Sequence, residues 1–291
     1  METDVPCICP LCRGTAEVAG VLRGGSPTFQ DREYTYWRCA ACGFVWCDTE
    51  PAPYDDDYWG TVDVRWQQRD GGIGQVSDFL LPLGVGSLRL IDYGCGKGTL
   101  VRLLRQHGHD AVGVDAFEPE TDHTFRTVER TGFAPGTADA ATAVEVFEHL
   151  SVEEARAALG EIRSVLAPGG MLLITTPFVD VAGPLVPQDW WAARPPWHRS
   201  LYSHKAMRRL LTEGRFNWVT FPDPAQVALA RSGPPLVMGG ETAEDRNRFR
   251  ATEAELASLR EHCARLQERV ERVRRLWLFK AYRALKRLLR R

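Results

Sequence analysis

Two carboxylates and an imidazole follow one short apolar run, at Glu145, Glu148 and His149. The run itself, residues 141–144, predicts a buried strand, and ligands gather just past the strand ends of open α/β sheets. Carboxylate oxygens and an imidazole can together hold a divalent cation, which lowers the pKa of a coordinated hydroxyl. Without a metal, His149 or one glutamate can act as a general base while the other acid orients it. A third interpretation is structural, with Glu148 and His149 capping the following turn.

Four cysteines form a second group with chemistry of its own. Cys9 and Cys12 make one C-x-x-C pair, and Cys39 and Cys42 make another, with 26 residues between the pairs. Thiolates three residues apart on a tight turn can face one tetrahedral Zn²⁺. We predict a structural zinc ribbon with closed coordination; redox chemistry is the alternative, and Cys7 is an alternative ligand to Cys9.

A glycine-rich turn predicts how these groups are positioned. The stretch Leu90-Ile91-Asp92-Tyr93-Gly94-Cys95-Gly96-Lys97-Gly98 predicts a buried parallel strand, a tight turn and the start of a helix. Glycines let the backbone approach a ligand closely, and the N–H groups of a helix start favour a carboxylate or phosphate. A second short strand ends at Asp115, where a carboxylate can accept both hydroxyls of a ribose. A dinucleotide and S-adenosylmethionine (SAM) both fit this pattern.

Further elements follow from periodicity and from turn residues. We expect helices over about 66–81, 97–107, 152–166 (ended by Ala167-Pro-Gly-Gly170) and 203–211, and strands over about 88–92, 111–115, 171–176, 216–221 and 226–231. This alternation predicts an α/β fold with a doubly wound, mostly parallel sheet.

The ordered motifs resemble those of class I SAM-dependent methyltransferases, which have a Rossmann-like fold. The resemblance covers about residues 65–220 and rests on four stretches: Ile91-Asp-Tyr-Gly-Cys-Gly-Lys-Gly98, Gly113-Val-Asp115, Val146-Phe-Glu-His-Leu150 and Leu166-Ala-Pro-Gly-Gly170. A zinc ribbon followed by a Tyr-rich connection is similar to a branch of the family found in bacterial sugar and surface-polysaccharide pathways.

The resemblance implies where SAM binds. Gly94 and Gly96 would flank its methionine part, Asp92 would hold its amino group through the turn, and Asp115 would hold its ribose hydroxyls. The full set of implied cofactor-binding residues is Asp92, Gly94, Cys95, Gly96, Asp115, Ala116 and Glu145. Only 23 residues separate Asp115 from Asp139, so the family's usual helix, strand and adenine loop must be shortened. No adenine contact is assigned there, beyond the conjecture that Phe117 stacks on the base.

The E-x-x-E-H pattern resembles that of ubiquinone-pathway O-methyltransferases and of RNA 3′-terminal 2′-O-methyltransferases. In those relatives a downstream histidine completes a divalent-metal site, for which His198 and His204 are the candidates. The implied catalytic residues are Glu148, His149 and His198, and the implied ligands for Mg²⁺ or Mn²⁺ are Glu145, Glu148, His149 and His198. In the structural alternative Glu145 contacts SAM.

Aromatic segments are the candidates for acceptor binding. The connection over 51–64 is either a linker that packs its rings on the next domain or a lid over the substrate. The loop after the fifth strand contains Trp190, Trp191 and Trp197, whose faces suit stacking on sugar rings; the alternative is a hydrophobic loop packed over the sheet edge.

The charge distribution separates the C-terminal end from the rest. Residues 272–291 hold nine of the 36 basic residues and no acid, which leaves 27 basic against 38 acidic residues elsewhere. Such an acidic body argues against a nucleic-acid partner. Heptad spacing over 249–275 favours self-association, as a homo-oligomer or with a partner, over docking on the body. The basic amphipathic face of 276–291 fits an anionic membrane surface.

The predicted organisation is a zinc ribbon (1–50), an aromatic linker (51–64), a methyltransferase domain (65–232), a second linker (233–248), a coiled-coil helix (249–275) and a basic amphipathic helix (276–291). No apolar run reaches ~18 residues, so we expect a cytoplasmic protein, peripheral on the inner face of the membrane. The expected reaction is O-methylation of a sugar hydroxyl in a lipid-linked or surface glycan. Alternatives are a nucleotide-linked sugar or natural product, an RNA methyltransferase, and an inactive SAM-fold scaffold.

Overall fold

Short runs of apolar residues form the central strands of the larger sheet. The computed structural model describes residues 7–50, 52–54, 58, 73, 74, 76, 87–118, 120–181, 183, 186, 188, 190–223 and 226–232. Within these, seven strands form one sheet in the order β10-β11-β8-β7-β4-β5-β6. Their bounds are β4 Arg89–Tyr93, β5 Asp110–Val114, β6 Thr124–Phe125, β7 Ala138–Val144, β8 Leu166–Thr175, β10 Phe216–Asp223 and β11 Val227–Ser232.

This sheet is mostly parallel, as predicted. Strands β6, β5, β4, β7 and β8 are parallel neighbours, and only the pairings made by β11 are antiparallel. The chain order reverses at β4, which lies between β5 and β7. Open α/β sheets bind ligands in the crevice at such a switch point, outside the carboxyl ends of the strands.

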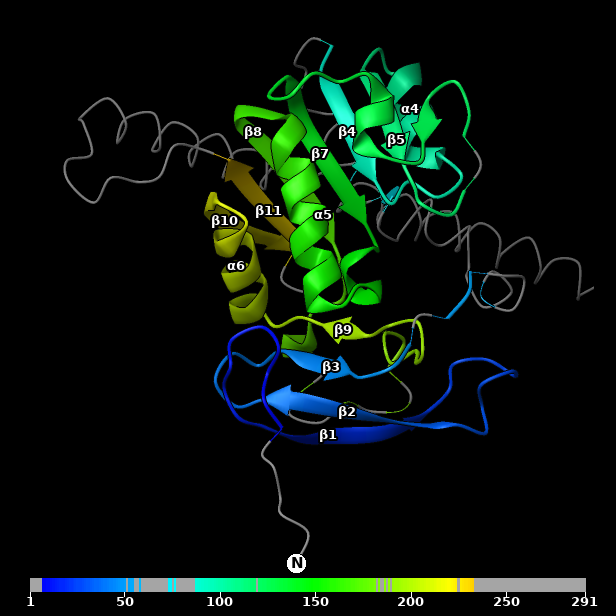
Figure 1. The fold of residues 1–291 in the computed structure, drawn as a ribbon, viewed down its shortest axis with the longest axis vertical. Helices are drawn as coiled ribbons and strands as arrows, with labels where there is room; N and C mark the ends of the chain where they lie inside the picture. The colour runs from blue at the N-terminus through cyan, green and yellow to red at the C-terminus, as the bar shows by residue number, and fades with distance from the viewer. Residues whose placement is uncertain are drawn as a thin grey trace, which may run out of the picture. The chain divides into compact units, whose positions relative to one another are not determined.

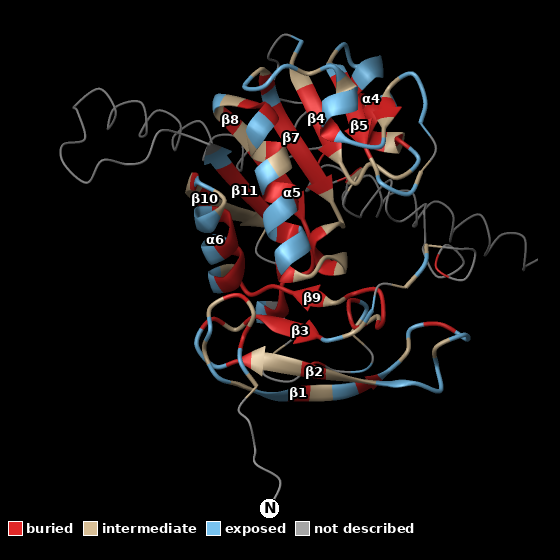
Figure 2. Ribbon diagram, in the orientation of Figure 1, coloured by how far each residue is buried: buried red, intermediate tan, exposed pale blue. Residues whose placement is uncertain are grey.

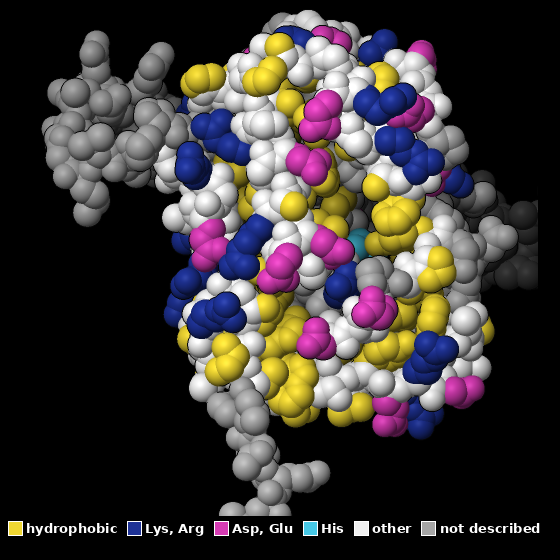
Figure 3. All heavy atoms as spheres, in the orientation of Figure 1, with side chains coloured by type: hydrophobic (Ala, Val, Ile, Leu, Met, Phe, Trp, Pro, Cys, Tyr) yellow, Lys and Arg dark blue, Asp and Glu magenta, His cyan; other side chains and the backbone are white. Residues whose placement is uncertain are grey.

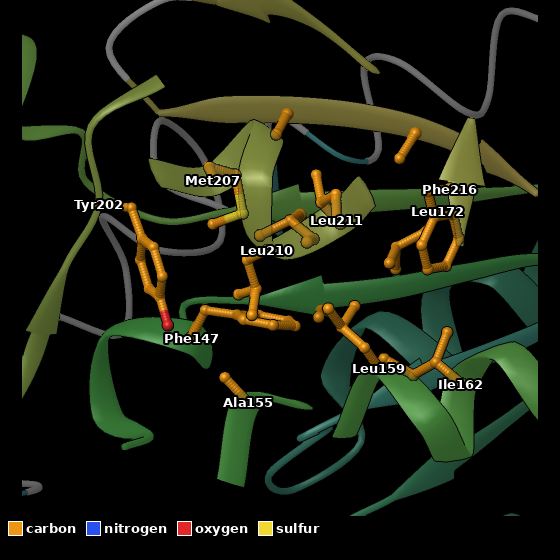
Figure 4. Close-up of a cluster of buried hydrophobic side chains, with 14 of the residues drawn as sticks. Phe147, Ala155, Leu159, Ile162, Leu172, Tyr202, Met207, Leu210, Leu211 and Phe216 are labelled. Atoms are coloured by element: carbon orange, nitrogen blue, oxygen red, sulfur yellow. The ribbon is translucent and has the colours of Figure 1, made fainter. Parts of the chain in front are cut away.

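Three α-helices among the described residues pack around the sheet: α4 Thr99–Gln106, α5 Val152–Val165 and α6 His204–Glu213. A capping box fixes the start of α5, because Ser151 Oγ accepts from the Glu154 N–H at 3.2 Å while Glu154 Oε2 accepts from the Ser151 N–H at 2.7 Å. Figure 4 shows the core that α5 and α6 share with β8, in which Leu159, Leu172 and Leu210 are fully buried. Figure 2 shows the buried strands against the exposed outer face of α5.

Two predicted boundaries change in the structure. The helix expected over 152–166 ends at Val165, and Leu166 already belongs to β8, because it pairs with Ala138 before an irregularity in the ladder. The short segment 117–136 keeps a two-residue strand, β6, but its helix is reduced to one 3-10 turn, η2 Val128–Thr131. Most of the helix expected over 66–81 lies outside the described residues.

A second sheet joins the N-terminal strands to a strand from the loop after β8. Its strands are β1 Ala16–Arg23, β2 Glu33–Cys39, β3 Val45–Cys47 and β9 Ser200–Leu201, in the order β1-β2-β3-β9. Strands β1 to β3 belong to the segment predicted as a zinc ribbon, which is called the ribbon below, whereas β9 comes from the loop after β8. Val45 pairs with Leu201, and Trp46 pairs with Ser200. In Figure 1 this sheet lies below the larger one, on the side toward which β4 and β7 point.

Aromatic packing makes the ribbon and the methyltransferase region one unit. Phe44 stacks on Trp46 and contacts Tyr202, which in turn packs against Phe147. The predicted zinc ribbon and methyltransferase domain therefore fall within one compact unit, Met1–Leu236. The second unit, Val237–Arg291, contains the predicted coiled-coil and basic helices and lies outside the described residues. No helix among the described residues is long and apolar enough to span a bilayer.

Side-chain types are unevenly spread over the face of Figure 3. Hydrophobic side chains gather over its lower half, where the ribbon lies, while basic and acidic side chains are interspersed over the rest.

Candidate active site

The glycine turn after β4 is built around backbone conformations that favour glycine. Gly94 and Gly96 have φ values of +71° and +49°. A Cβ on Gly94 would lie 2.4 Å from Val146 Cγ2, so this residue also makes room for the chain that follows β7. A Cβ on Gly96 would meet no atom within 4 Å, which shows that the space beside this backbone is open.

Asp115 fixes the other side of the turn. Its Oδ2 accepts from the Gly96 N–H at 2.9 Å, and its Oδ1 accepts from the N–H groups of Phe117 at 2.9 Å and Glu118 at 3.1 Å. The carboxylate therefore holds the turn after β4 and the turn after β5 at a set separation. One lone pair of Oδ2 remains for a ligand hydroxyl.

Asp92 lies deeper in the same crevice. Its side chain is 3% exposed, and Oδ1 accepts from Thr142 Oγ1 at 2.6 Å. Burial, with a smaller contribution from the neighbouring Asp115, raises the pKa of Asp92 to about 7. The sequence did not single out Thr142, which β7 places opposite Asp92.

A cavity of about 570 Å³ opens at the carboxyl ends of β4, β5 and β7. All seven residues assigned to SAM line it: Asp92, Gly94, Cys95, Gly96, Asp115, Ala116 and Glu145. His149 lines it as well, which places one member of the proposed catalytic group against the cofactor space.

Beside this cavity, Glu148, His149 and His198 lie close together. One potential ligand atom from each lies within 4.8 Å of the others, and the two imidazole rings meet edge to face with centroids 4.8 Å apart. Glu148 and His149 belong to the 3-10 turn η3, Phe147–His149, while His198 precedes β9. Glu145, at φ +53°, lines the cavity but is not in this three-residue group.

Backbone carbonyls orient both imidazoles. Nδ1 of His149 lies 3.1 Å from the Trp197 carbonyl oxygen, and Nδ1 of His198 lies 2.9 Å from that of Ala192. With Nδ1–H donated, Nε2 of each ring is left as a lone-pair donor, the arrangement that a metal ligand or a general base requires. Burial lowers the pKa of His149 to about 4 and holds the pKa of His198 well below its usual range, so both rings are neutral at pH 7.

Glu148 has one oxygen in use and one free. Its Oε2 accepts from Thr176 Oγ1 at 2.8 Å, whereas Oε1 is buried without a hydrogen-bond partner. Burial, followed by the charge of Glu145, holds the pKa of Glu148 well above its usual range. An orphaned carboxylate oxygen beside two imidazoles fits either a bound cation or a proton. The positive charge of Arg194 also lowers the pKa of both histidines, as any nearby cation would.

His204, the other candidate histidine, lies elsewhere. Its Nδ1 is 3.4 Å from Asp180 Oδ2, and its ring packs against Phe178 and Phe221 at centroid distances of 4.8 and 4.4 Å. Of the two alternatives, it is His198 that lies beside Glu148 and His149.

The two aromatic segments predicted for acceptor binding differ in whether they line the cavity. Trp197 is 2% exposed and packs on Tyr58, and Trp190 packs against the ribbon core. Neither these two nor the exposed Trp191 line the cavity, and the burial of Trp197 favours the packing alternative for this loop. Tyr54 and Tyr58 of the aromatic connection do line it, and this placement supports the lid interpretation over the linker.

Phe117 lines the cavity as well. Its side chain is 69% exposed and lies against the Tyr54 ring with centroids 5.1 Å apart. Tyr54 also contacts Tyr58 and His149, at 4.9 and 5.6 Å. These three aromatic rings and His149 therefore form one wall, which we call the aromatic wall.

The four predicted zinc ligands lie together. The Sγ atoms of Cys9, Cys12, Cys39 and Cys42 are all within 4.8 Å of one another, with Cys9 to Cys42 at 3.8 Å and Cys12 to Cys39 at 3.4 Å. Four thiolates around a tetrahedral Zn²⁺, each about 2.3 Å from the metal, are about 3.8 Å apart. Cys7 is not in the group.

The raised pKa of Asp92 predicts how cofactor affinity depends on pH. The carboxylate form pairs with a ligand ammonium group, so SAM affinity should rise about tenfold per unit between pH 5.5 and 7. Because the folded pKa lies above the unfolded value, ionising Asp92 should also cost the free protein stability as pH rises from about 4 to 7. Calorimetric titrations at several pH values test the first effect. An Asp92→Asn variant whose affinity kept the same slope would contradict the assignment.

Comparison with known proteins gives the family. A family model described as "Methyltransferase domain" matches residues 65–220. A ubiquinone biosynthesis O-methyltransferase of Cereibacter sphaeroides is 32% identical over 113 residues, which cover 34% of this chain and 45% of that protein; one of Dinoroseobacter shibae is 31% identical with the same coverage. The chain thus spans about half the length of the curated relatives it matches.

The chain is also similar to solved methyltransferase structures. An S-adenosylmethionine-dependent methyltransferase from Mesorhizobium loti has a TM-score of 0.40 and 17% identity, covering 56% of this chain and 99% of that one. The 1,6-didemethyltoxoflavin-N1-methyltransferase of Burkholderia thailandensis has a TM-score of 0.42 and 15% identity, covering 67% and 98%. Because the family model matches more than half of the residues, this chain belongs to the methyltransferase-domain family.

Proposed function

We propose that this enzyme transfers the SAM methyl group to a hydroxyl oxygen of a sugar in a lipid-linked or surface glycan. The observation that carries O-methylation is His149, which lines the cofactor cavity on one side and contacts the buried Glu148 and His198 on the other. The curated relatives are named O-methyltransferases, which supports a hydroxyl as the acceptor.

The chain's own residues provide a base for that hydroxyl. A sugar hydroxyl is a weak nucleophile, and it must lose its proton as it attacks the sulfonium methyl. Nε2 of His149 is available for the proton because Nδ1 faces the Trp197 carbonyl. The low pKa keeps this nitrogen unprotonated at pH 7, and Glu148 is close enough to stabilise the imidazolium once it forms.

The same residues fit a divalent cation. Glu148 Oε1 and the Nε2 atoms of His149 and His198 would hold Mg²⁺ or Mn²⁺, whereas Glu145, the fourth predicted ligand, is not in this group. When bound, the cation would lower the pKa of the acceptor hydroxyl. The metal and the metal-free base are alternatives for one site. EDTA treatment of the parent enzyme separates them.

The aromatic wall supports a ring-shaped acceptor. Tyr54, Tyr58 and Phe117 present ring faces and edges beside His149, and aromatic faces stack well on the apolar faces of sugars. Aromatic hydroxyl acceptors are the second candidate, because the curated relatives belong to ubiquinone biosynthesis and an aromatic ring would stack on the same wall.

An acceptor panel tests the proposal. The enzyme is incubated with SAM and, separately, with nucleotide-linked sugars, a lipid-linked oligosaccharide and a catechol, and products are checked by mass spectrometry for one added methyl group. We expect methylated sugar from the lipid-linked oligosaccharide. Methylation of the catechol alone would overturn the sugar acceptor in favour of the second candidate; methylation of nucleotide-linked sugar alone would move the reaction to an earlier precursor.

The cysteine group is proposed as a structural zinc site. We expect one zinc per chain by elemental analysis, and we expect Cys39→Ser to lose the metal and to lower the unfolding temperature by several degrees. Cys7→Ser is the matched control and should keep both. Loss of zinc in Cys7→Ser, or its retention in Cys39→Ser, would contradict this ligand set.

Association and location remain proposals. The coiled-coil segment 249–275 and the basic segment 276–291 lie outside the described residues, and with them the proposed self-association and peripheral binding to the inner face of the membrane. Flotation of the full chain on anionic liposomes, compared with a chain ending near Glu271, tests the second.

A further inference from the structure

A tyrosine of the ribbon contacts the catalytic group from a distant part of the chain. Tyr36, on β2, is fully buried, and its hydroxyl donates to the backbone carbonyl of His198 at 2.6 Å. The two residues are 162 positions apart in the sequence.

The residue after His198 is held on two sides. The carbonyl of Arg199 accepts from the Cys47 N–H of β3 at 2.9 Å, while its own N–H donates to the Glu148 carbonyl at 2.7 Å. The backbone at 198–199 therefore bridges the ribbon and the turn η3, which carries Glu148 and His149. A shift of the ribbon would move both halves of the catalytic group relative to each other.

The carbonyl that orients His149 is also supported by the ribbon. It belongs to Trp197, whose ring packs edge to face on Phe29, in the loop between β1 and β2, with centroids 5.4 Å apart. In the same loop, the Gly25 N–H donates to the Pro195 carbonyl at 2.7 Å. Both imidazoles are thus oriented by a loop, 192–198, that the ribbon holds in place.

We propose that Tyr36 is a positioning residue for methyl transfer, which sets the placement of His198 through its backbone carbonyl and makes the ribbon part of the acceptor side of the active site. The inference rests on the proposed roles of His149 and His198. It goes further in that it assigns the ribbon a role in catalysis besides holding zinc. Misplacing a catalytic group by about 1 Å can cost about 10²-fold in rate, so removing one hydroxyl should be measurable.

The test compares Tyr36→Phe with Tyr34→Phe, which removes a hydroxyl two residues away on the same strand. We expect Tyr36→Phe to lower kcat about 10- to 100-fold with SAM affinity within about threefold of the parent, and Tyr34→Phe to leave both unchanged. In a His198→Asn background the added effect of Tyr36→Phe should disappear, because the residue it positions is gone. An equal effect in both backgrounds would overturn the proposal.

A second readout needs no acceptor and so separates this proposal from the proposed function. NMR signals and titration of the His149 and His198 imidazoles should shift in Tyr36→Phe and not in Tyr34→Phe. If Tyr36→Phe does not fold, 3-fluorotyrosine at position 36 keeps the ring and changes the donor strength of the hydroxyl, and it should shift the His198 signals. Unchanged imidazole signals in the folded variant would overturn the role of Tyr36, whichever acceptor the enzyme uses.

Discussion

Replacing Glu148 with glutamine is expected to lower kcat by about 10²- to 10⁴-fold, with SAM affinity within about threefold of the parent. Glutamine has the same shape and can still accept from Thr176 Oγ1, but it cannot carry the charge that a cation or an imidazolium needs. Glu148 does not line the cofactor cavity, so SAM binding should be spared. The measurement is steady-state methyl transfer beside a calorimetric SAM titration.

EDTA treatment and the Glu148→Gln variant together separate the three interpretations of the group. If a metal is required, EDTA should abolish activity in the parent, and Mg²⁺ or Mn²⁺ should restore it. If His149 is a metal-free base, EDTA should have no effect while Glu148→Gln stays slow. Glu153→Gln, an exposed acid at the start of α5, is the matched control. Full activity of Glu148→Gln with a lowered unfolding temperature would leave only the structural interpretation.

Replacing Asp115 with alanine is expected to weaken SAM binding about 100-fold or more. Hydrogen bonds to a charged acceptor contribute about 1.5–3 kcal/mol each, and about 1.4 kcal/mol corresponds to a factor of ten. The variant loses the bond to a ribose hydroxyl and also releases the N–H groups of Gly96, Phe117 and Glu118, which order the two turns. Both effects weaken SAM binding.

The control for Asp115→Ala is Asp122→Ala. Asp122 is an acid of the same region whose side chain is 82% exposed. SAM and S-adenosylhomocysteine titrations should show the loss in the first variant and parent affinity in the second. Affinity within about threefold of the parent in Asp115→Ala would remove this residue from the cofactor site.

Features encoded in contiguous residues were predictable from the sequence. The turn from Ile91 to Gly98 and the acid at Asp115 are local patterns, and the structure places their side chains around one cavity. The end of α5 was predicted one residue late because a Pro-Gly-Gly sequence normally follows a helix. Here Leu166 pairs with Ala138, so sheet pairing overrides the local signal.

Features that depend on distant contacts were not predictable. Strand β9 is two residues long and has no periodicity to detect, and its partner Val45 lies far away in sequence. Tertiary packing also buries Trp197 against Tyr58, away from the cavity lining. His198 and His204 could not be separated by residue type, because only the fold shows that one lies beside Glu148.

The pairing of β9 with β3 also constrains how the protein folds during its synthesis. Synthesis runs from the N-terminus, so β1 to β3 leave the ribosome long before Leu201, the strand partner of Val45, has been translated. Until then the edge of β3 lacks its strand partner, and the Phe44 ring lacks the cover that Tyr202 later supplies. The nascent ribbon is therefore a segment that chaperones or premature self-pairing can reach, and its maturation waits for the last third of the chain.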